Sequence, residues 1–238
     1  MARRRFFVDS VNHNTAELCG DEARHLTRVL RVEAGTRYEI SDGESVYLAE
    51  ITEARRERVV FRVIERLDST EPPIRITLLT ALIKFDRFEW IVEKATELGV
   101  ERIIPVNAVR SERGLMEASH KRRERWMRIA RESAQQSRRA RLPEILPARG
   151  FEESLAEPAD VRYFLEENVA PSLLRVLPAD RLPGVRAAVL VGPEGGWTDT
   201  ERQSAAARGW QPVSLGPQVL RAETAAAAAL AILMNAWY

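Results

Sequence analysis

The sequence contains a single cysteine, Cys19, among its 238 residues. One thiol can form neither an intrachain disulfide nor a thiolate metal cluster, so we expect a reducing compartment, the cytoplasm. Histidine is scarce as well: His13, His25 and His120 are scattered, without carboxylate or cysteine neighbours at the spacing of metal ligands. We therefore expect no metal site.

Long apolar runs are also lacking. The longest one lies within residues 225–236, well short of the roughly 20 residues that span a bilayer. At the N-terminus, Arg3, Arg4 and Arg5 are not followed by an apolar stretch long enough for a signal peptide. We expect neither a membrane-spanning segment nor export by that route.

The net charge is only +1, but the charges are unevenly distributed. Residues 110–141 contain eleven Lys and Arg against four Glu, a balance of +7, whereas residues 142–238 have eight Arg against twelve Asp and Glu, a balance of −4. A basic segment of this kind can contact the phosphates of a nucleic acid. It can equally be a solvated charged face, and both interpretations remain open.

The first seventy residues predict a small β-barrel or sandwich. Short apolar runs are separated by turn-forming residues at Gly35 and Asp42-Gly43, and they cover residues 5–8, 37–41, 45–51 and 58–64. A helix is expected over residues 21–32, with Arg24, Arg28 and Arg31 together on one side. The polar stretch 67–73 ends in paired prolines and predicts a boundary between domains 1–71 and 72–238.

After this boundary, predicted strands alternate with helices. A capping box at Thr198–Glu201 begins one of these helices, and Gly209 ends it. Another helix extends from an N-cap candidate, Ser119, to residue 142, where Pro143 stops it. The other predicted helices cover residues 86–98 and 223–237, and the predicted strands cover 74–82, 100–106, 161–165, 187–191 and 213–215. The pattern is typical of an α/β domain with a mainly parallel sheet.

A glycine-rich segment, Val191-Gly192-Pro193-Glu194-Gly195-Gly196-Trp197, joins the most apolar strand to the capped helix. Loops at the carboxyl ends of parallel strands bind ligands in open α/β sheets, and glycines let the backbone approach a flat ligand closely. Neither the P-loop pattern nor the dinucleotide fingerprint fits this loop. A tight turn without a ligand is the alternative interpretation.

A second loop, residues 215–224, also lies between a strand and a helix, so the two loops can converge on one pocket. Arg221 and Glu223 stand at the start of the last helix. Charged groups there are costly to bury unless they pair or act on a substrate. The alternative for Glu223 is a favourable interaction with the helix dipole, which disfavours a cation such as Arg221.

Together these motifs resemble the SPOUT class of methyltransferases, and specifically the 16S ribosomal RNA uracil-N3 methyltransferases of the RsmE type. The resemblance covers nearly the whole chain. In its first part, residues 25–31 with Gly35 resemble the PUA-like RNA-binding barrel of that family. The other matching segments are residues 94–99 with 104–105, 132–138 with Pro143, 192–196, 215–216 and 220–225. Pro217-Gln218-Val219 departs from the family pattern, which has a basic residue and an isoleucine there.

The resemblance implies an α/β SPOUT domain with a deep trefoil knot, a topology almost absent from other proteins. It also implies an obligate homodimer with the site near the subunit interface, where the alanines at 225–229 would allow close helix approach. The alternative interpretation of these alanines is that alanine is the best intrinsic helix former. S-adenosylmethionine (SAM) is the implied methyl donor. The residues implied to bind it are Leu165, Glu166, Gly192, Pro193, Glu194, Gly195, Gly196, Leu215, Gly216, Leu220 and Thr224.

The implied substrate is 16S rRNA or the small ribosomal subunit. Methylation at pyrimidine C5 generally needs a nucleophilic cysteine, and Cys19 lies away from both loops, which favours a nitrogen or oxygen acceptor. For uracil N3, Arg221 is the candidate for stabilising the imide anion, and Glu223 is the candidate base or orienting residue. The candidate RNA-binding residues are Arg3, Arg4, Arg5, Arg28, Arg31, Arg110, Arg113 and Arg138.

Other functions remain open at this level. A ribose 2′-O or guanine N1 acceptor fits the same SAM loops, because these loops do not define the acceptor atom. A non-catalytic RNA-binding protein accounts for the barrel and the basic helix, but it has no use for the two loops beside Arg221 and Glu223. SAM binding distinguishes a methyltransferase from a non-catalytic RNA-binding protein.

Overall fold

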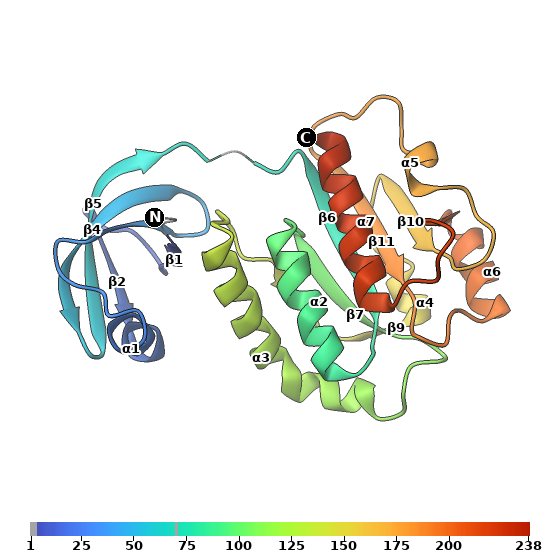
Figure 1. Ribbon diagram of the computed structural model, residues 1–238, viewed down its shortest axis with the longest axis horizontal. Helices are drawn as coiled ribbons and strands as arrows, with labels where there is room; N and C mark the ends of the chain where they lie inside the picture. Colours follow the sequence, from blue (N-terminus) through green and yellow to red (C-terminus); the bar gives the residue numbers. More distant parts are fainter. Residues whose placement is uncertain (1–3, 70) are drawn as a thin grey trace. The chain divides into compact units, whose positions relative to one another are not determined.

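The computed structural model describes residues 4–69 and 71–238, and Arg3 lies outside the described residues. The chain forms two compact units (Figure 1). Unit 1 comprises the residues up to 71 together with residues 131–142, and unit 2 comprises residues 72–130 and 143–238. The sequence pattern gave no indication that residues 131–142 pack with the N-terminal residues.

In its described residues, unit 1 contains a five-stranded sheet in the strand order β1-β3-β4-β5-β2, a short helix, and the last residues of a longer helix that begins in unit 2. Strands β1 and β3 are parallel, and the other neighbours are antiparallel. The core contains Phe6, Leu26, Ile40, Ile51 and Phe61, all fully buried. The elements are β1 (Arg5–Phe7), β2 (Thr15–Cys19), α1 (Gly20–Arg28), β3 (Arg37–Ser41), β4 (Val46–Arg55) and β5 (Arg58–Leu67).

Two predictions for unit 1 were wrong. Helix α1 ends at Arg28 instead of residue 32, because the amide of Leu30 bonds to the carbonyl of His25 and Arg31 adopts a left-handed conformation (φ 51°). Arg31 therefore does not share a helix face with Arg28. Strand β2 was missed, although its five residues alternate between exposed and buried.

Unit 2 contains a seven-stranded sheet in which every paired strand is parallel, in the order β12-β10-β11-β6-β7-β8, with β9 also pairing with β7. The strands are β6 (Ile74–Ala81), β7 (Arg102–Asn107), β8 (Glu144–Ile145), β9 (Arg149–Gly150), β10 (Val161–Leu165), β11 (Val185–Val191) and β12 (Gln211–Val213). The helices are α2 (Phe85–Glu97), α3 (Leu115–Gln136), α4 (Phe151–Ser154), α5 (Leu173–Val176), α6 (Asp199–Ala207) and α7 (Ala222–Trp237).

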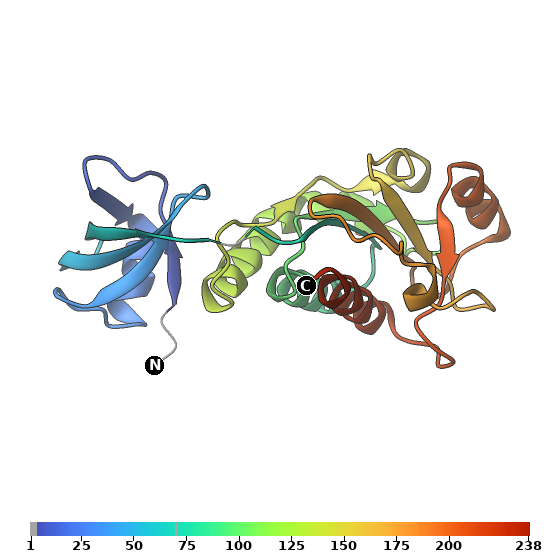
Figure 2. The same ribbon diagram turned by 90° about the horizontal axis from the view of Figure 1, so that it is seen from above.

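Helices cover both faces of this sheet, as the turned view shows for α2 and α7 on one side and α6 on the other (Figure 2). Alternate residues of a strand point to opposite faces. In β6, Leu78 packs in the cluster that includes α2, α3 and α7, whereas Leu79 packs in the cluster that includes α4 and α6. A sheet buried on both faces accounts for the continuous apolar strands of the sequence.

The local sequence patterns predicted the ends of α2, α6 and α7, but those of α3 were wrong, and the short elements α4, α5, β8 and β9 were not predicted. The capping box of α6 is present, with Thr198 and Glu201 each bonding the other's backbone amide. Helix α3 begins at Leu115, and Ser119 lies buried within it, donating to the carbonyl of Met116. It ends at Gln136 because Arg138 is left-handed (φ 58°) and the amide of Arg139 bonds to the carbonyl of Ala134. The last strand ends at Val213 and not at residue 215.

Among residues 4–69 and 71–238, no helix is long and apolar enough to cross a bilayer. In the same residues, no group of three His, Cys, Asp or Glu side chains could hold a metal ion.

Candidate functional site

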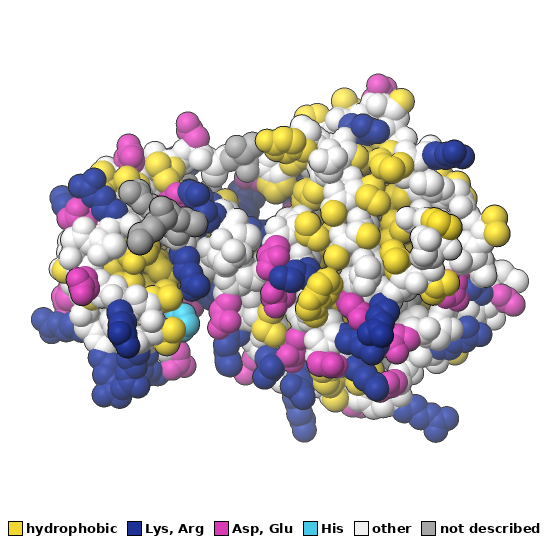
Figure 3. All heavy atoms as spheres, in the orientation of Figure 1, with side chains coloured by type: hydrophobic (Ala, Val, Ile, Leu, Met, Phe, Trp, Pro, Cys, Tyr) yellow, Lys and Arg dark blue, Asp and Glu magenta, His cyan; other side chains and the backbone are white. Residues whose placement is uncertain are grey.

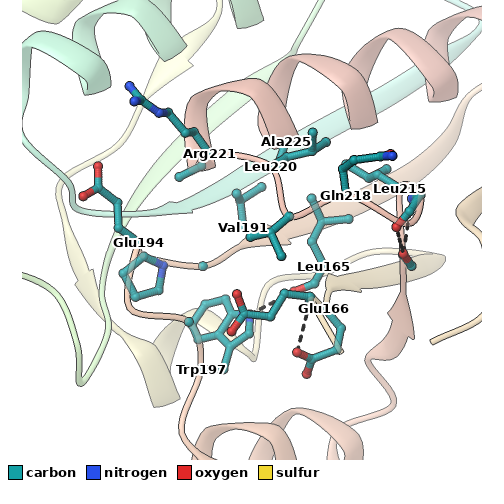
Figure 4. Close-up of a pocket in the computed structure, with 18 of the residues that line it drawn as sticks. Leu165, Glu166, Val191, Glu194, Trp197, Leu215, Gln218, Leu220, Arg221 and Ala225 are labelled. Carbon is teal, nitrogen blue, oxygen red and sulfur yellow. Dashed lines mark hydrogen bonds between the residues drawn. The ribbon is translucent and has the colours of Figure 1, made fainter. Parts of the chain in front are cut away.

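A cavity of about 400 Å³ lies at the carboxyl ends of β10, β11 and β12, where Leu165, Val191 and Val213 end their strands (Figure 4). This is the position at which open α/β sheets bind ligands. The cavity brings together many of the residues that the sequence suggested: Leu165, Glu166, Gly192, Pro193, Glu194, Gly196, Leu215, Gly216, Leu220 and Arg221.

The glycine-rich loop after β11 is shaped by Trp197, whose indole is 2% exposed and donates to the carbonyl of Leu165 at 3.0 Å. A Cβ atom on Gly192 would lie only 2.9 Å from that ring. Gly196 has a φ of +68°, which favours glycine. The loop thus needs glycine at these two positions, so that the chain can pass close to a buried aromatic ring and then turn.

The loop after β7 supports the glycine-rich loop. Arg110, a predicted RNA-binding residue, donates from Nη1 to the carbonyls of Gly195 (2.7 Å) and Trp197 (3.3 Å). The buried carboxylate of Glu201 accepts from the amide of Val109 at 2.9 Å. These bonds connect the end of β7 to the start of α6 and thereby fix the loop between β11 and α6.

Glu166 forms the end of the cavity near β10 and is held by Arg202, whose Nε and Nη2 donate at 2.6 and 3.1 Å. Burial raises the pKa of the Glu166 carboxyl, but the Arg202 guanidinium and the amides of Asn168 and Glu167 lower it more. The net pKa therefore lies below its ordinary value, and Glu166 carries a negative charge at neutral pH.

The pair of Glu166 and Arg202 is expected to make stability depend on acidic pH. Because folding lowers the pKa of Glu166, its stabilising contribution is fully present above the unfolded-state pKa of about 4.3 and is lost as the pH falls through the folded-state pKa. The melting temperatures of the wild type and Glu166→Gln should therefore converge as the pH is lowered from about 7 to about 3. Glu152→Gln, which alters the exposed pair with Arg208, is the control, and a gap that stays constant with pH contradicts the prediction.

The second loop, between β12 and α7, contributes the opposite wall. The Ser214 hydroxyl accepts from the amide of Gly216 and donates to its carbonyl, which closes the loop tightly. Arg221 is the N-cap residue of α7 and is exposed. Figure 4 shows Arg221 and Glu194 on the same side of the cavity. Two charged side chains from different loops therefore lie toward one end of the site.

Three of the predicted site residues do not line the cavity: Gly195, Thr224 and Glu223. The Glu223 side chain is 13% exposed, and its Oε2 atom is buried without a hydrogen-bond partner. Glu223 thus lies near the cavity wall but does not form part of it.

Several lining residues were not predicted, and Arg87 of α2 is the most distinctive of them. It forms an ion pair with Glu194, and its Nε lies 4.0 Å from Oε1 of Glu223. In the sequence it is one charged residue of a predicted helix, more than a hundred residues from either partner, so no local pattern indicates its role. The other unpredicted lining residues are Glu167, Val191, Trp197, Val213, Ser214, Gln218, Val219, Ala222 and Ala225.

The predicted RNA-binding arginines differ in their surroundings. Arg5 and Arg138 both pair with Glu39, a buried carboxylate of unit 1. Burial raises the pKa of Glu39, but the hydrogen bonds from Arg138 and Arg5 lower it by more than burial raises it. The net pKa of Glu39 therefore lies below its ordinary value. The Arg5 side chain is only 12% exposed, which leaves little of it for a ligand. The exposed members of the set are Arg4, Arg28, Arg31, Arg110, Arg113 and Arg138.

Comparison with known proteins gives matches over both units. Residues 70–234 match a family described as RNA methyltransferase domain, and residues 18–64 match one described as RNA methyltransferase PUA domain. The chain is 36% identical to a ribosomal RNA small subunit methyltransferase E of Synechocystis, covering 91% of this chain and 72% of that relative. It is 31% identical to the Bacillus subtilis protein of the same name, covering 97% and 95% of the two chains.

Solved structures agree with these matches. A ribosomal RNA small subunit methyltransferase E from Neisseria gonorrhoeae, bound to S-adenosyl methionine, superposes with a TM-score of 0.88 at 32% identity, covering 99% of this chain and 98% of that one. A putative methyltransferase from Legionella pneumophila, in complex with SAM, superposes with a TM-score of 0.90 at 27% identity and the same coverage. The likeness therefore extends over both units.

Proposed function

The chain belongs to the RNA methyltransferase family that includes the ribosomal RNA small subunit methyltransferases E, and we propose that it transfers a methyl group from SAM to N3 of a uridine in 16S rRNA. The observation that carries this proposal is the cavity at the ends of β10, β11 and β12. It gathers the three loops that the motif resemblance assigns to the methyl donor.

The residues of the cavity fit SAM, which supplies an electrophilic methyl group on a sulfonium when bound. The volume of about 400 Å³ lies within the usual range for small-ligand sites. Leu165, Val191 and Leu220 provide apolar surface for the adenine ring, and the loop backbones provide amides and carbonyls. Charged groups from the lining, such as Glu167, suit the ammonium of the methionine part.

Methyl transfer is a direct displacement, so the protein must mainly position the acceptor nitrogen in line and help it lose a proton. Arg221 is an exposed cation at the cavity wall and can stabilise the negative charge that develops on the uracil imide. Because Glu223 does not line the cavity, we assign it an orienting role rather than direct proton acceptance.

Exposed arginines of each unit are the proposed RNA contacts. Arg28 and Arg31 of unit 1 have exposed side chains, and so has Arg113 of unit 2. Guanidinium groups of this kind bind phosphates through several donors. Arg110 donates a hydrogen bond to the carbonyl of Gly195 in the glycine-rich loop. A phosphate bound to Arg110 would therefore contact a residue that also holds this loop in place.

We further propose that the enzyme is a cytoplasmic homodimer, acts on the 16S rRNA of the small subunit and contains the trefoil knot of its family. Figure 3 shows apolar side chains gathered on the face of unit 2 around α7. Helix α7 contributes exposed or half-buried alanines to that face, among them Ala225, Ala228 and Ala231. Small side chains allow the close helix approach that a dimer contact needs.

The proposed reaction is tested on small ribosomal subunits that lack the methyl group. Purified enzyme and SAM are incubated with these subunits, and the nucleosides are then identified by mass spectrometry after nuclease digestion. We expect one 3-methyluridine per subunit. Another methylated nucleoside contradicts the acceptor assignment alone, whereas an enzyme that neither binds SAM nor modifies RNA contradicts the catalytic proposal and favours a binding protein.

A further inference from the structure

Arg87, from a third element, helix α2, contacts the glycine-rich loop and the first turn of α7. It lines the cavity itself, and its guanidinium pairs with Glu194 in the glycine-rich loop. On its other side, its Nε lies 4.0 Å from a carboxylate oxygen of Glu223, in the first turn of α7. Helix α2 packs directly against α7. One side chain therefore joins the β11–α6 loop to the start of α7.

Glu223 depends on this cation more than Glu194 does. The Glu223 side chain is 13% exposed and has one buried oxygen without a hydrogen-bond partner, whereas Glu194 is 45% exposed and reaches water. An ionised carboxylate at the degree of burial of Glu223 is costly unless a cation compensates it. In the described part of the chain, Arg87 is the cation within ion-pair distance of Glu223. The amides at the start of α7 add favourable dipoles but no full charge.

The chemistry of arginine suits such a shared position. A guanidinium has five N–H donors in a rigid plane and stays protonated, so it can serve two carboxylates at once. Lysine supplies the same charge at a single point and cannot reproduce the planar geometry. The Arg87 side chain is 29% exposed, so water screens these pairs less than it screens a surface ion pair.

We infer that Arg87 is a positioning residue that, through Glu194 and Glu223, holds the two cavity loops at the spacing required for SAM. This inference rests on the proposed function, because it takes the cavity to be the SAM site. Arg87 fixes Glu194 directly. It also fixes Glu223 and, with it, the first turn of α7 from which Arg221 extends. Without Arg87, both loops lose their common anchor, and the cavity is less well organised before the ligand binds.

The test compares Arg87→Ala and Arg87→Lys with the wild type, using calorimetric SAM affinity and turnover on small subunits. We expect Arg87→Ala to raise the Kd for SAM about 10-fold or more, because the ion pairs that hold the two loops in the binding geometry are lost. Arg87→Lys should recover part of this loss. Lys94→Ala is the control, because Lys94 lies on the same helix, pairs with Glu93 and Glu97, and does not line the cavity.

A double-mutant cycle separates positioning from a general loss of stability. If Arg87 acts through Glu223, Glu223→Gln should raise the SAM Kd in the wild type but change it little in Arg87→Ala. The double variant also removes the uncompensated buried charge, so it should melt at a higher temperature than Arg87→Ala. SAM affinity within two-fold of the wild type in folded Arg87→Ala, or strictly additive effects in the cycle, overturns the inference. An enzyme that shows these effects but methylates another atom contradicts only the acceptor assignment.

Discussion

Replacing Arg221 by alanine is expected to lower kcat for methylation of small subunits about 100-fold or more, the usual loss when one group that stabilises transition-state charge is removed. Arg221 lines the cavity, is exposed, and stands at the N-cap of α7. Since a helix N-terminus repels a cation, this position does not serve the stability of α7. A positive charge there is best accounted for by an anion that forms in the cavity, such as the uracil imide.

The effect should appear in turnover and hardly in SAM affinity, because the imide charge develops only during the reaction. Calorimetry for SAM and single-turnover kinetics for methylation separate the two quantities. Arg175→Ala removes an exposed arginine of α5 that does not line the cavity and is the matched control. Full turnover of Arg221→Ala with normal SAM affinity would remove Arg221 from the mechanism.

The family and the two-part fold could be predicted from the sequence, and the comparisons confirm both predictions. The features predicted best are local ones. The capping box of α6 and the helix end at Gly99 depend on residues a few positions apart, and both are present in the structure. The glycine-rich loop was identified for the same reason: it directly follows a strand of continuous apolar residues.

Features that depend on distant residues were missed. The end of α3 was placed at Pro143, yet the helix stops earlier, at a left-handed Arg138 whose guanidinium pairs with Glu39. Arg131 donates to the carbonyl of Phe7 and to Glu22, and such contacts attach residues 131–142 to unit 1. No local sequence pattern indicates these contacts, because the two residues of each contact lie about a hundred positions apart in the chain.

The candidate site shows the same division. Its glycines and the residues at strand ends were predicted, whereas the side chains that shape it from outside were not. Trp197 was identified only as the last residue of the glycine-rich segment, and Arg87 only as one charged residue of a predicted helix. The roles of Arg221, Glu223 and the SAM-binding residues stay predictions, as does the trefoil knot.

Gly192→Ala is expected to weaken SAM binding about 10-fold or more and to lower the free energy of unfolding by about 1–3 kcal/mol, as overpacking of a rigid interior does. The added Cβ atom would lie 2.9 Å from Cε2 and 3.0 Å from Nε1 of Trp197. The indole cannot easily withdraw, because it packs against Phe151 and Phe164 at ring-centroid distances of 5.3 and 4.8 Å. It also donates to the carbonyl of Leu165 at 3.0 Å.

Any movement that relieves this clash changes the cavity, because Gly192, Trp197 and Leu165 all line it. Chemical denaturation gives the change in unfolding free energy, and calorimetry gives the SAM affinity of the folded variant. Gly150→Ala is the matched control, since a Cβ atom there meets nothing within 4 Å and the backbone φ is negative. If Gly192→Ala binds SAM as Gly150→Ala does, the close approach of the loop to Trp197 does not determine the shape of the methyl-donor site.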